Sequence, residues 1–480
     1  MSQAPVILWF RHDLRLCDHY PLDTTARLSV PNIPFFVFDE VGEGDWPIGG
    51  ASRWWLHHSL EKLGKDLERL GSRLILRHGR TETELAKLVQ ETGATAVYCH
   101  RRYEPAARKL EREVAARLKK DGVELISFPG QLLFEPDDIR TQQDKPYQVF
   151  TPYWRTCQKQ ASRIAAPLGK PRSLPAPTHW PRSELLNDLQ LLPAIPWDKE
   201  FYDTWTPGEA GARARLMALR RSIADYPAER NRPDHEGSSR LSPHLHFGEI
   251  SPRQVWHAVH KWIDDGVVTA GAANVFLAEL GWREFTHHVL HHFPSTPKSA
   301  LREEFRKFPW KDSKTHAHAW QRGLTGYPIV DAGMRQLWRT GWMHNRVRMI
   351  VGSFLTKDLR HNWLEGARWF WDTLVDADLA QNTFNWQWIG GCGADAAPYF
   401  RIFNPTLQGR KFDPEGGYVR RWVPELARCP TKWIHEPWSA PADELAAAGI
   451  TLGVDYPEPI VDHAEARDRA LEALGSIRRK

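Results

Sequence analysis

The stretch VILWF, at residues 6–10, opens a regular alternation of short apolar runs and longer amphipathic segments. Valine, isoleucine and aromatic residues favour β-strands, and runs of this kind recur four more times before residue 130. Between two of them, Ser52 to Leu70 carries leucines at helical spacing on one stripe. Strands that alternate with helices indicate βαβ units, so we expect residues 1–130 to form an α/β domain with a doubly wound parallel sheet. The later runs are IPFFVF (33–38), SRLILRHG (72–79), TAVYCH (95–100) and GVELISF (122–128).

Beyond residue 130 the alternation ends. We expect residues 131–205 to be an interdomain linker that wraps the surface, because KPRSLPAPTHWPRS (170–183) is rich in proline and polar residues. After about residue 206 helical patterns dominate, so residues 206–480 are predicted to form an all-α domain. These patterns cover 208–224, 252–265, 270–292, 329–340, 344–359, 363–375 and 462–478.

The length and composition agree with a globular protein of more than one domain. The 480 residues exceed the roughly 250–300 that one hydrophobic core organises. The net charge of +5 is mildly basic and does not by itself indicate a nucleic-acid partner. The 23 tryptophans exceed what a core needs, and they indicate stacking surfaces, electron transfer or an aromatic ligand site.

Nothing in the sequence indicates secretion or a membrane. The five cysteines are widely spaced without a CxxC pair, which argues against a disulfide framework and a cysteine-ligated metal. The N-terminal apolar run is too short for a signal sequence, and no apolar run reaches the length of a membrane span. We therefore expect a cytosolic protein.

A serine-rich stretch, EGSSRLSPHLHFGEISPRQ (236–254), precedes a helical pattern. Ser238, Ser239 and Ser242 offer hydroxyl groups close to free backbone N–H groups, which suits an anion or phosphate. The alternative is that these serines only cap helices.

The segment AELGWREFTHHVLHH (278–292) places Glu279 and Trp282 three residues apart on one helix face. Glu279 can bind a polar ligand group while Trp282 stacks beside it, or the helix buries the indole and solvates the carboxylate. Two histidine pairs also have metal-capable spacing, but no glutamate lies between them as in a zinc protease, so we expect a polar helix face and no metal. The pairs are His287/His291 and His288/His292.

Basic and aromatic residues alternate between residues 335 and 360. This pattern suits a phosphate-lined groove with an apolar floor, built around Trp338, Trp342 and Met349. An amphipathic helix with a solvated cationic face is an equal alternative. The basic residues are Arg335, Arg339, Arg346, Arg348, Lys357 and Arg360.

The segment 371–405 combines acidic, amide and aromatic residues. Its acidic side chains, Asp372, Asp376 and Asp378, suit general acids, metal ligands or acceptors for a cofactor. Trp386 and Trp388 lie one residue apart, in a stretch that does not read as a simple core helix. On an extended or turning backbone, a spacing of two would direct the two indoles to different sides. The glycines that follow permit a turn there: Gly390, Gly391 and Gly393.

Several long motifs, in the same order, resemble the photolyase/cryptochrome family over nearly the whole chain. The resemblance implies an N-terminal α/β antenna domain, a linker, and a C-terminal helical domain that holds a U-shaped FAD. The motifs are WFRHDLRL (9–16), SSRLSPHLHFGEISPRQ (238–254), ELGWREF (279–285), TGYPIVDAGMRQLWRTGWMHNRVRM (325–349) and DADLAQNTFNWQWIGGCGADAAPYFRIFNPTLQGRKFDP (376–414).

The resemblance implies a flavin contact for each matching residue. Serine hydroxyls would bind the pyrophosphate, Asp376 would accept from the isoalloxazine N3–H and pair with Arg348, and Asn382 would face the flavin N5. The full set is Tyr226, Ser238, Ser239, Arg240, Leu241, Ser242, Glu279, Arg283, Asn345, Arg348, Asp376, Asp378 and Asn382.

The resemblance also implies catalytic and DNA-binding roles. A flipped-out lesion would lie between Trp282 and Trp388. An electron would travel to the flavin from Trp310 through Trp363 to Trp386, with Glu279 and Asn382 as further catalytic residues. The implied DNA-binding residues are Arg230, Trp282, Asn345, Arg346, Met349 and Trp388.

Within the family, three features favour DNA repair. Asn382 and Trp388 stand where plant cryptochromes carry Asp and Tyr, and the sequence stops at residue 480, whereas plant cryptochromes often continue into a long signalling tail. Other stretches, such as ASRWWLHHSLEKL (51–63), are similar to plant cryptochromes, a mixture that resembles the bacterial class III photolyases. The (6-4) enzymes have a His-His pair and a WMW motif at the corresponding places, whereas this chain has His344-Asn345 and WQW (386–388). This difference favours cyclobutane pyrimidine dimers as the substrate.

The implied activity is light-driven repair, in which excited reduced FAD donates an electron to the dimer and regains it after the bonds split. One alternative is a cryptochrome-type blue-light receptor without repair activity, and another is a nucleic-acid-binding protein without flavin. We expect 5,10-methenyltetrahydrofolate as the antenna, with deazaflavin second, although Ala107 and Pro297-Lys298 replace the folate contacts of class I enzymes. We further expect a monomer in the bacterial cytoplasm, associated with the nucleoid when bound to damaged DNA.

Overall fold

The computed structural model describes residues 4–396 and 400–478; residues 397–399, which belong to the motif after Trp388, lie outside these ranges. The chain forms two compact units, each assembled from segments that are distant in sequence. The first comprises Met1–Ala224, Ser239–Pro294 and Val375–Ala380, and the second comprises Asp225–Ser238, Ser295–Leu374 and Gln381–Lys480. The domain boundaries predicted near residues 130 and 205 stay predictions.

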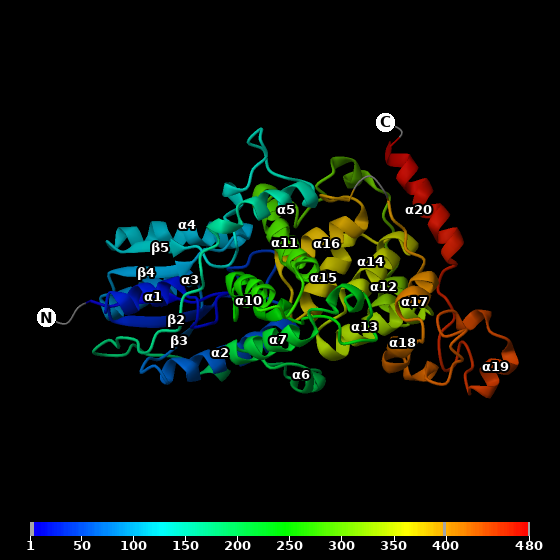
Figure 1. Ribbon diagram of the computed structural model, residues 1–480, viewed down its shortest axis with the longest axis horizontal. Helices are drawn as coiled ribbons and strands as arrows, with labels where there is room; N and C mark the ends of the chain where they lie inside the picture. Colours follow the sequence, from blue (N-terminus) through cyan, green and yellow to red (C-terminus); the bar gives the residue numbers. More distant parts are fainter. Residues whose placement is uncertain (1–3, 397–399, 479–480) are drawn as a thin grey trace. The chain divides into compact units, whose positions relative to one another are not determined.

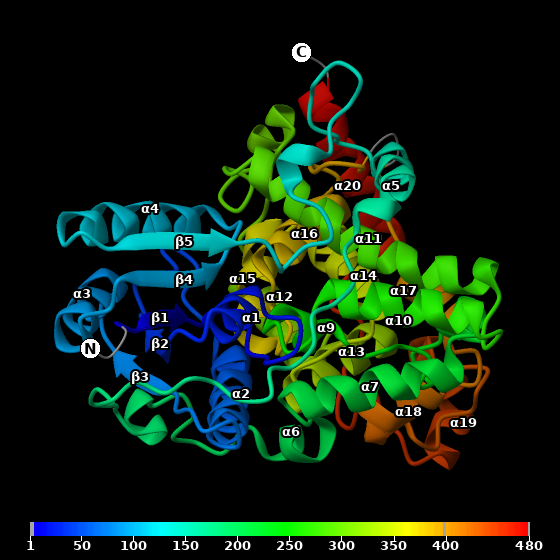
Figure 2. The same ribbon diagram turned by 60° about the vertical axis from the view of Figure 1, so that its left-hand side comes forward.

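A five-stranded, all-parallel sheet forms the core of the first unit, which confirms the doubly wound fold predicted from the sequence. The strand order is β3-β2-β1-β4-β5, as Figure 2 shows. The four residues of β1 are all buried, as expected for a central strand that is covered on both faces. The strands are β1 (Val6–Trp9), β2 (Asn32–Phe38), β3 (Ile75–His78), β4 (Ala96–His100) and β5 (Glu124–Phe128).

Four helices connect these strands. Right-handed crossovers place the first two helices on one face of the sheet and the last two on the other, because the strand order reverses after β3. Leu60, Leu63 and Leu67 of the predicted leucine stripe are buried on the inner side of α2. The helices are α1 (Tyr20–Arg27), α2 (Gly50–Glu68), α3 (Thr81–Thr92) and α4 (Pro105–Lys120).

The proline-rich segment 170–183 is ordered along the first unit. The backbone N–H of Leu76 in β3 donates to Ser183 Oγ (2.9 Å), and the N–H of Glu184 donates to the Leu76 carbonyl (3.0 Å). These bonds occupy the outer edge of β3, where unpaired backbone groups would otherwise invite another strand. Trp180 also packs against the core of the sheet.

The first unit also contains the helices around residues 150–292 (Figure 1). A capping box starts α10, where Ser251 Oγ accepts from the N–H of Gln254 (3.0 Å) and Gln254 Oε1 accepts from the N–H of Ser251 (2.8 Å). Thr269 caps α11 with a single bond, in which its side chain accepts from a backbone N–H of the first helical turn. The helices are α5 (Phe150–Lys159), α6 (Lys199–Thr204), α7 (Glu209–Ser222), α9 (Ser242–His246), α10 (Pro252–Asp264) and α11 (Ala270–His292).

One buried carboxylate, that of Glu249, ties several of these segments together. Its side chain accepts from the Trp55 indole (3.0 Å), the Ser59 hydroxyl (2.6 Å) and the backbone N–H of Gly208 (2.7 Å). His244 contacts its second oxygen. These partners lie in three places: in α2, in α9, and in the loop that precedes α7. Glu249 therefore holds the helical segment against the α/β core.

The second unit is built from helices. The pattern at 344–359 is not one regular helix as predicted, since it divides into α14 and a π-helical turn, η5 (Phe354–Asp358). No helix within residues 4–396 and 400–478 is long and apolar enough to cross a membrane. The helices are α8 (Tyr226–Glu229), α12 (Lys314–Arg322), α13 (Pro328–Thr340), α14 (Asn345–Ser353), α15 (Trp363–Thr373), α17 (Pro405–Phe412), α18 (Gly417–Trp422), α19 (Ala442–Ala447) and α20 (His463–Arg478), while α16 (Leu379–Gly390) starts in the first unit and ends in the second.

The Glu249 contacts predict a large loss of stability for Glu249→Ala. The substitution leaves four buried donors without their acceptor, so we expect the free energy of unfolding to fall by about 3–5 kcal/mol. Chemical denaturation, monitored by circular dichroism, measures this free energy of unfolding. The control, Glu303→Ala, removes an exposed carboxylate and should change the value by less than about 0.5 kcal/mol. A loss below about 1 kcal/mol for Glu249→Ala would contradict the role of this residue.

Candidate functional site

Three polar side chains lie in the protein interior within seven residues of the chain. Asp376, Asp378 and Asn382 are 7%, 4% and 8% exposed, and the residues between and before them are almost entirely buried and apolar. Asp372, by contrast, is exposed on α15. Burying a carboxylate or an amide is costly unless it finds partners, so this segment is suited to a ligand with both donors and acceptors.

The orientation of the Asn382 amide follows from one contact. Its Nδ2 donates to the Ala367 carbonyl (2.9 Å) in α15, which leaves the amide oxygen as the group that Asn382 offers to another donor. Arg348 is held by a bond from its Nε to the Met343 carbonyl (2.7 Å), and its guanidinium lies 5.9 Å from the Trp342 ring centre. The predicted pairing of Asp376 with Arg348 remains a prediction.

Of the predicted phosphate-binding serines, Ser238 and Ser239 lie in a loop, and Ser242 is the first residue of the helix α9. Ser239 Oγ accepts from the N–H of Leu241 (3.4 Å), and Leu241, not a serine, is the N-cap residue of α9. Arg240 adopts a left-handed backbone conformation at φ 51°. The alternative that Ser238, Ser239 and Ser242 cap helices is wrong, because the N-cap residue of α9 is Leu241 and that of α10 is Ser251.

On α11, Glu279 and Trp282 are both half-buried. Trp282 stacks on Phe150 with ring centres 3.7 Å apart and planes 10° apart, so one face of the predicted lesion platform is covered within its own unit. Sequence reasoning did not find Phe150, because a single phenylalanine 132 positions away carries no local signal. Arg283 is buried and donates to the Gln131 carbonyl (2.8 Å).

The four histidines of α11 each have a partner in the first unit. His288 Nε2 accepts from the backbone N–H of Tyr147 (3.0 Å), His291 lies 3.0 Å from Asp137, and His292 lies 3.1 Å from the Pro136 carbonyl. His287 contacts Asp378, with Nε2 and Oδ2 3.4 Å apart. Asp137, His291 and His292 form a metal-capable group, but Arg140 already pairs with Asp137 (2.8 Å).

Trp386 and Trp388 both lie within the helix α16, so the backbone that carries them is helical and not extended. Two residues of an α-helix are separated by about 200° around the axis, so the indoles still face different sides. Trp386 is buried against Phe370 (ring centres 5.0 Å apart) and Trp320 (6.2 Å). Trp388 is half-buried, donates to the Asp395 carbonyl (3.1 Å) and lies 5.2 Å from the Arg401 guanidinium.

Glycines let α15 and α16 approach closely, with a tryptophan on each side. A Cβ added to Gly366 of α15 would lie 2.1 Å from the Trp386 ring, and a Cβ added to Gly390 of α16 would lie 3.7 Å from the Cβ of Trp363. The predicted turn after the two tryptophans is present, with Gly391 at φ 80°.

Trp310, the outermost residue of the predicted electron route, lies half-buried in the neighbouring segment. The backbone N–H of the next residue, Lys311, donates to the Arg360 carbonyl (2.8 Å), and Lys311 forms a β-bridge with His361, two residues before Trp363. The segments that carry Trp310, Trp363 and Trp386 are therefore brought side by side in the second unit. That an electron passes along these three tryptophans stays a prediction.

The six basic residues between 335 and 360 do not line one groove, which corrects that alternative. Lys357 is fully buried, donates to the Gly390 carbonyl (2.7 Å), and burial holds its pKa well below the usual lysine value. Arg335 pairs with Glu425 (2.8 Å). A long basic side chain in a helical pattern does not reveal whether it is buried, and only the packing of η5 decided this for Lys357.

Arg346 forms a different basic group, together with Arg230. Burial and the nearby Arg230 cation both lower the pKa of Arg346, and Arg346 donates to Asn231 Oδ1 (2.7 Å). Its guanidinium also lies 4.4 Å from the Phe412 ring centre. Asn345 is exposed at the start of α14, and Met349 is half-buried on the same helix. Two cations held close together suit the binding of an anion.

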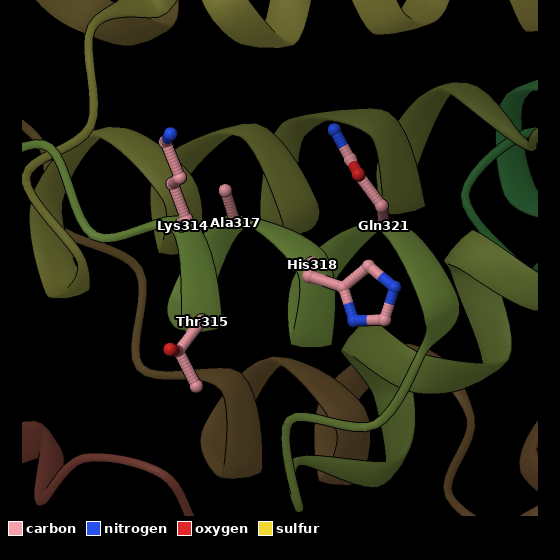
Figure 3. Close-up of a pocket in the computed structure, with 5 residues that line it drawn as sticks. All are labelled: Lys314, Thr315, Ala317, His318 and Gln321. Atoms are coloured by element: carbon pink, nitrogen blue, oxygen red, sulfur yellow. The ribbon is translucent and has the colours of Figure 1, made fainter.

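A surface hollow of about 580 Å³ lies beside α12 (Figure 3). Its lining comes from a single helix, which is too little to enclose a cofactor, since ligand pockets bury most of their ligand. The lining residues are Lys314, Thr315, Ala317, His318 and Gln321, and none of them belongs to the predicted site.

Known proteins resemble the whole chain. Residues 6–177 match the DNA photolyase family, and residues 276–476 match the FAD binding domain of DNA photolyase. A deoxyribodipyrimidine photo-lyase of Agrobacterium fabrum is 48% identical over 100% of this chain and 99% of its own length. Cryptochrome-1 of Arabidopsis thaliana is 37% identical over 98% of this chain and 70% of its own. A bacterial class III photolyase from Agrobacterium tumefaciens has a similar structure, with a TM-score of 0.96, 48% identity, and coverage of 100% and 99% of the two chains.

The close approach at Gly366 predicts that Gly366→Ala displaces Trp386. We expect overpacking to cost about 1–3 kcal/mol of stability, more than the gain in helix propensity of about 1 kcal/mol. Near-ultraviolet circular dichroism and chemical denaturation measure the change. The control is Gly64→Ala in α2, where no heavy atom lies within 4 Å, and it should be neutral or stabilising. Equal effects at both positions would show that Trp386 does not press on Gly366.

Proposed function

The chain belongs to the DNA photolyase family, and on that premise we propose that it is a deoxyribodipyrimidine photolyase that repairs cyclobutane pyrimidine dimers with light. The observation that carries the proposal is the 48% identity to a photo-lyase over the full length of both chains. The cryptochrome relative is more distant, at 37%, and it supports a light receptor as the second candidate.

We propose FAD as the cofactor, because the polar groups buried at Asp376, Asp378 and Asn382 fit its donors and acceptors. An amide that presents its oxygen, as Asn382 does, suits an N–H of reduced flavin. When bound, reduced FAD excited by light supplies the electron that splits the dimer. The residues proposed to bind it are Tyr226, Ser238, Ser239, Arg240, Leu241, Ser242, Glu279, Arg283, Asn345, Arg348, Asp376, Asp378 and Asn382.

The DNA partner is proposed from charge and stacking. The Arg230–Arg346 group suits a backbone phosphate, since neutralising anionic phosphates dominates the affinity of proteins for DNA. Trp282 and Trp388 each offer an indole for stacking on an unpaired base, which is worth about 1–3 kcal/mol per base. Asn345 and Met349 would contact the lesion beside them, with Glu279 as a further catalytic residue.

Trp310, Trp363 and Trp386 are proposed to conduct an electron inward from the surface, and the adjacency of their segments supports this order. The antenna chromophore is proposed to be 5,10-methenyltetrahydrofolate, with deazaflavin as the alternative. Ala107 is buried in α4 and offers no carboxylate to a folate, so a folate would need contacts other than those of class I enzymes.

The repair proposal predicts that the reduced protein restores thymines under blue light and not in the dark. The assay mixes purified protein with an ultraviolet-irradiated thymine oligonucleotide and follows the recovery of thymine absorbance. A flavin-containing protein that leaves the dimers intact under light would favour the receptor alternative. A colourless protein that binds the oligonucleotide would favour a nucleic-acid-binding protein without flavin.

The electron route predicts a separable defect for Trp363→Phe. Phenylalanine is harder to oxidise than tryptophan, so photoreduction of oxidised FAD should slow strongly, while repair by chemically pre-reduced protein should continue. Absorption spectroscopy under illumination measures the first rate, and the thymine assay measures the second. Photoreduction at the wild-type rate would exclude Trp363 from the route, and the exposed Trp338→Phe provides a control for indole loss as such.

A further inference from the structure

Two adjacent histidines of α11, both almost completely buried, have opposite surroundings. His287 is 4% exposed and His288 is 0% exposed. His288 Nε2 accepts a hydrogen bond from the backbone N–H of Tyr147, so that nitrogen carries no proton and the ring is neutral. Burial lowers the pKa of His288 to about 3, in agreement with this assignment.

His287 lies between two acceptors instead. Its Nδ1 is 3.0 Å from the Arg283 carbonyl, and its Nε2 is 3.4 Å from Asp378 Oδ2. Neither a carbonyl nor a carboxylate can donate, so the ring makes both contacts only if both of its nitrogens carry a proton. An imidazole with two N–H groups is a cation.

A cationic partner favours the ionised form of the buried Asp378 carboxylate. Its side chain is buried, and the other nearby ring, His246, has Nδ1 3.8 Å from Oδ2, which is beyond a hydrogen bond. A second ring, His12, lies behind His246 with ring centres 4.7 Å apart, and burial holds the pKa of His12 well below the usual histidine value. His12 is therefore neutral and does not compensate the carboxylate.

We propose that His287 is a permanent imidazolium at neutral pH and a positioning residue, whose charge keeps Asp378 ionised and oriented in the interior. Because Asp378 is one of the residues proposed to bind FAD, the consequence for the cofactor rests on the proposed function. The charge state of His287 itself does not, since it follows from contacts within the first unit.

Some charges near His287 favour the imidazolium and others disfavour it. The Asp378 carboxylate is the strongest of those that favour it. Desolvation disfavours the imidazolium, but Asp378 outweighs it and the pKa of His287 is raised above the usual histidine value. Burial would raise the pKa of Asp378, but His287 and, with a smaller contribution, His246 hold it well below that of an ordinary aspartate. The other charged or titratable groups that face His287 are Arg283 and Glu284 on α11 and Tyr103 and Glu104 before α4.

The stability of the folded protein depends on pH wherever the pKa of a group differs between the folded and the unfolded state. A histidine whose pKa is raised in the folded state stabilises that state. This stabilisation is fully present when the pH is below the pKa of the unfolded state, about 6.5, and it is lost as the pH rises through the pKa of the folded state. Asp378 adds no opposing change in that range, because its depressed pKa keeps it ionised there. The pair therefore weakens on the alkaline side.

The first test observes the imidazole nitrogens of the intact protein by NMR with ¹⁵N-labelled histidine. Among the 22 histidines, the His287 signals are those lost in both His287→Gln and His287→Arg, and those of His288 are lost in His288→Gln. We expect two protonated nitrogens for His287 at pH 7, with half-titration above about pH 7, and one protonated nitrogen for His288. A single protonated nitrogen on His287 at about pH 7, or half-titration at or below that pH, overturns the proposal.

The second test separates charge from shape by measuring FAD dissociation. We expect His287→Gln, which keeps a donor without the charge, to bind FAD about tenfold more weakly, while His287→Arg stays near the wild type. His288→Gln is the matched control and should also stay near it. Equal losses in His287→Gln and His287→Arg, or no loss in either, overturn the positioning role. A wild-type protein without FAD would refute the proposed function and leave the NMR test to decide the charge.

Discussion

A carboxylate that is buried loses its hydrogen bonds to water and needs protein donors in their place, and three carboxylates of the first unit show this. Asp18 binds Arg253 and Ser251, Glu249 binds Trp55, Ser59, Gly208 and His244, and Asp378 contacts His287. Each joins segments that are distant along the chain. The helical segment 239–294 consequently packs with the α/β sheet in one compact unit.

The second unit depends on a different constraint, the space that glycine leaves beside an indole. Gly366 accepts the Trp386 ring, and Gly390 lies against Trp363, so α15 and α16 approach more closely than larger residues would permit. The buried Lys357 then reaches the Gly390 carbonyl at the end of α16. The positions of the tryptophans proposed to carry electrons are thus a consequence of packing, and the same contacts serve stability.

The sequence predicted regular elements well where a period is long and uninterrupted. The pattern at 270–292 coincides with α11, and the five apolar runs coincide with the five strands. It failed for α16, because two tryptophans, amides and glycines in one stretch carry no clean helical period. It also treated Lys357 as part of a cationic face, although the lysine stem and amine are enclosed by η5 and Gly390.

By itself, the sequence determined the order of strands and helices, the family to which the chain belongs, and the residue types available for a flavin and for DNA. Only the tertiary structure decided which of these groups are buried and what they face. His287 and His288 are the same residue on the same helix, and no local pattern distinguishes them. One faces a carboxylate from residue 378 and the other faces an N–H from residue 147, so their protonation is set by partners about 90 and 140 residues away.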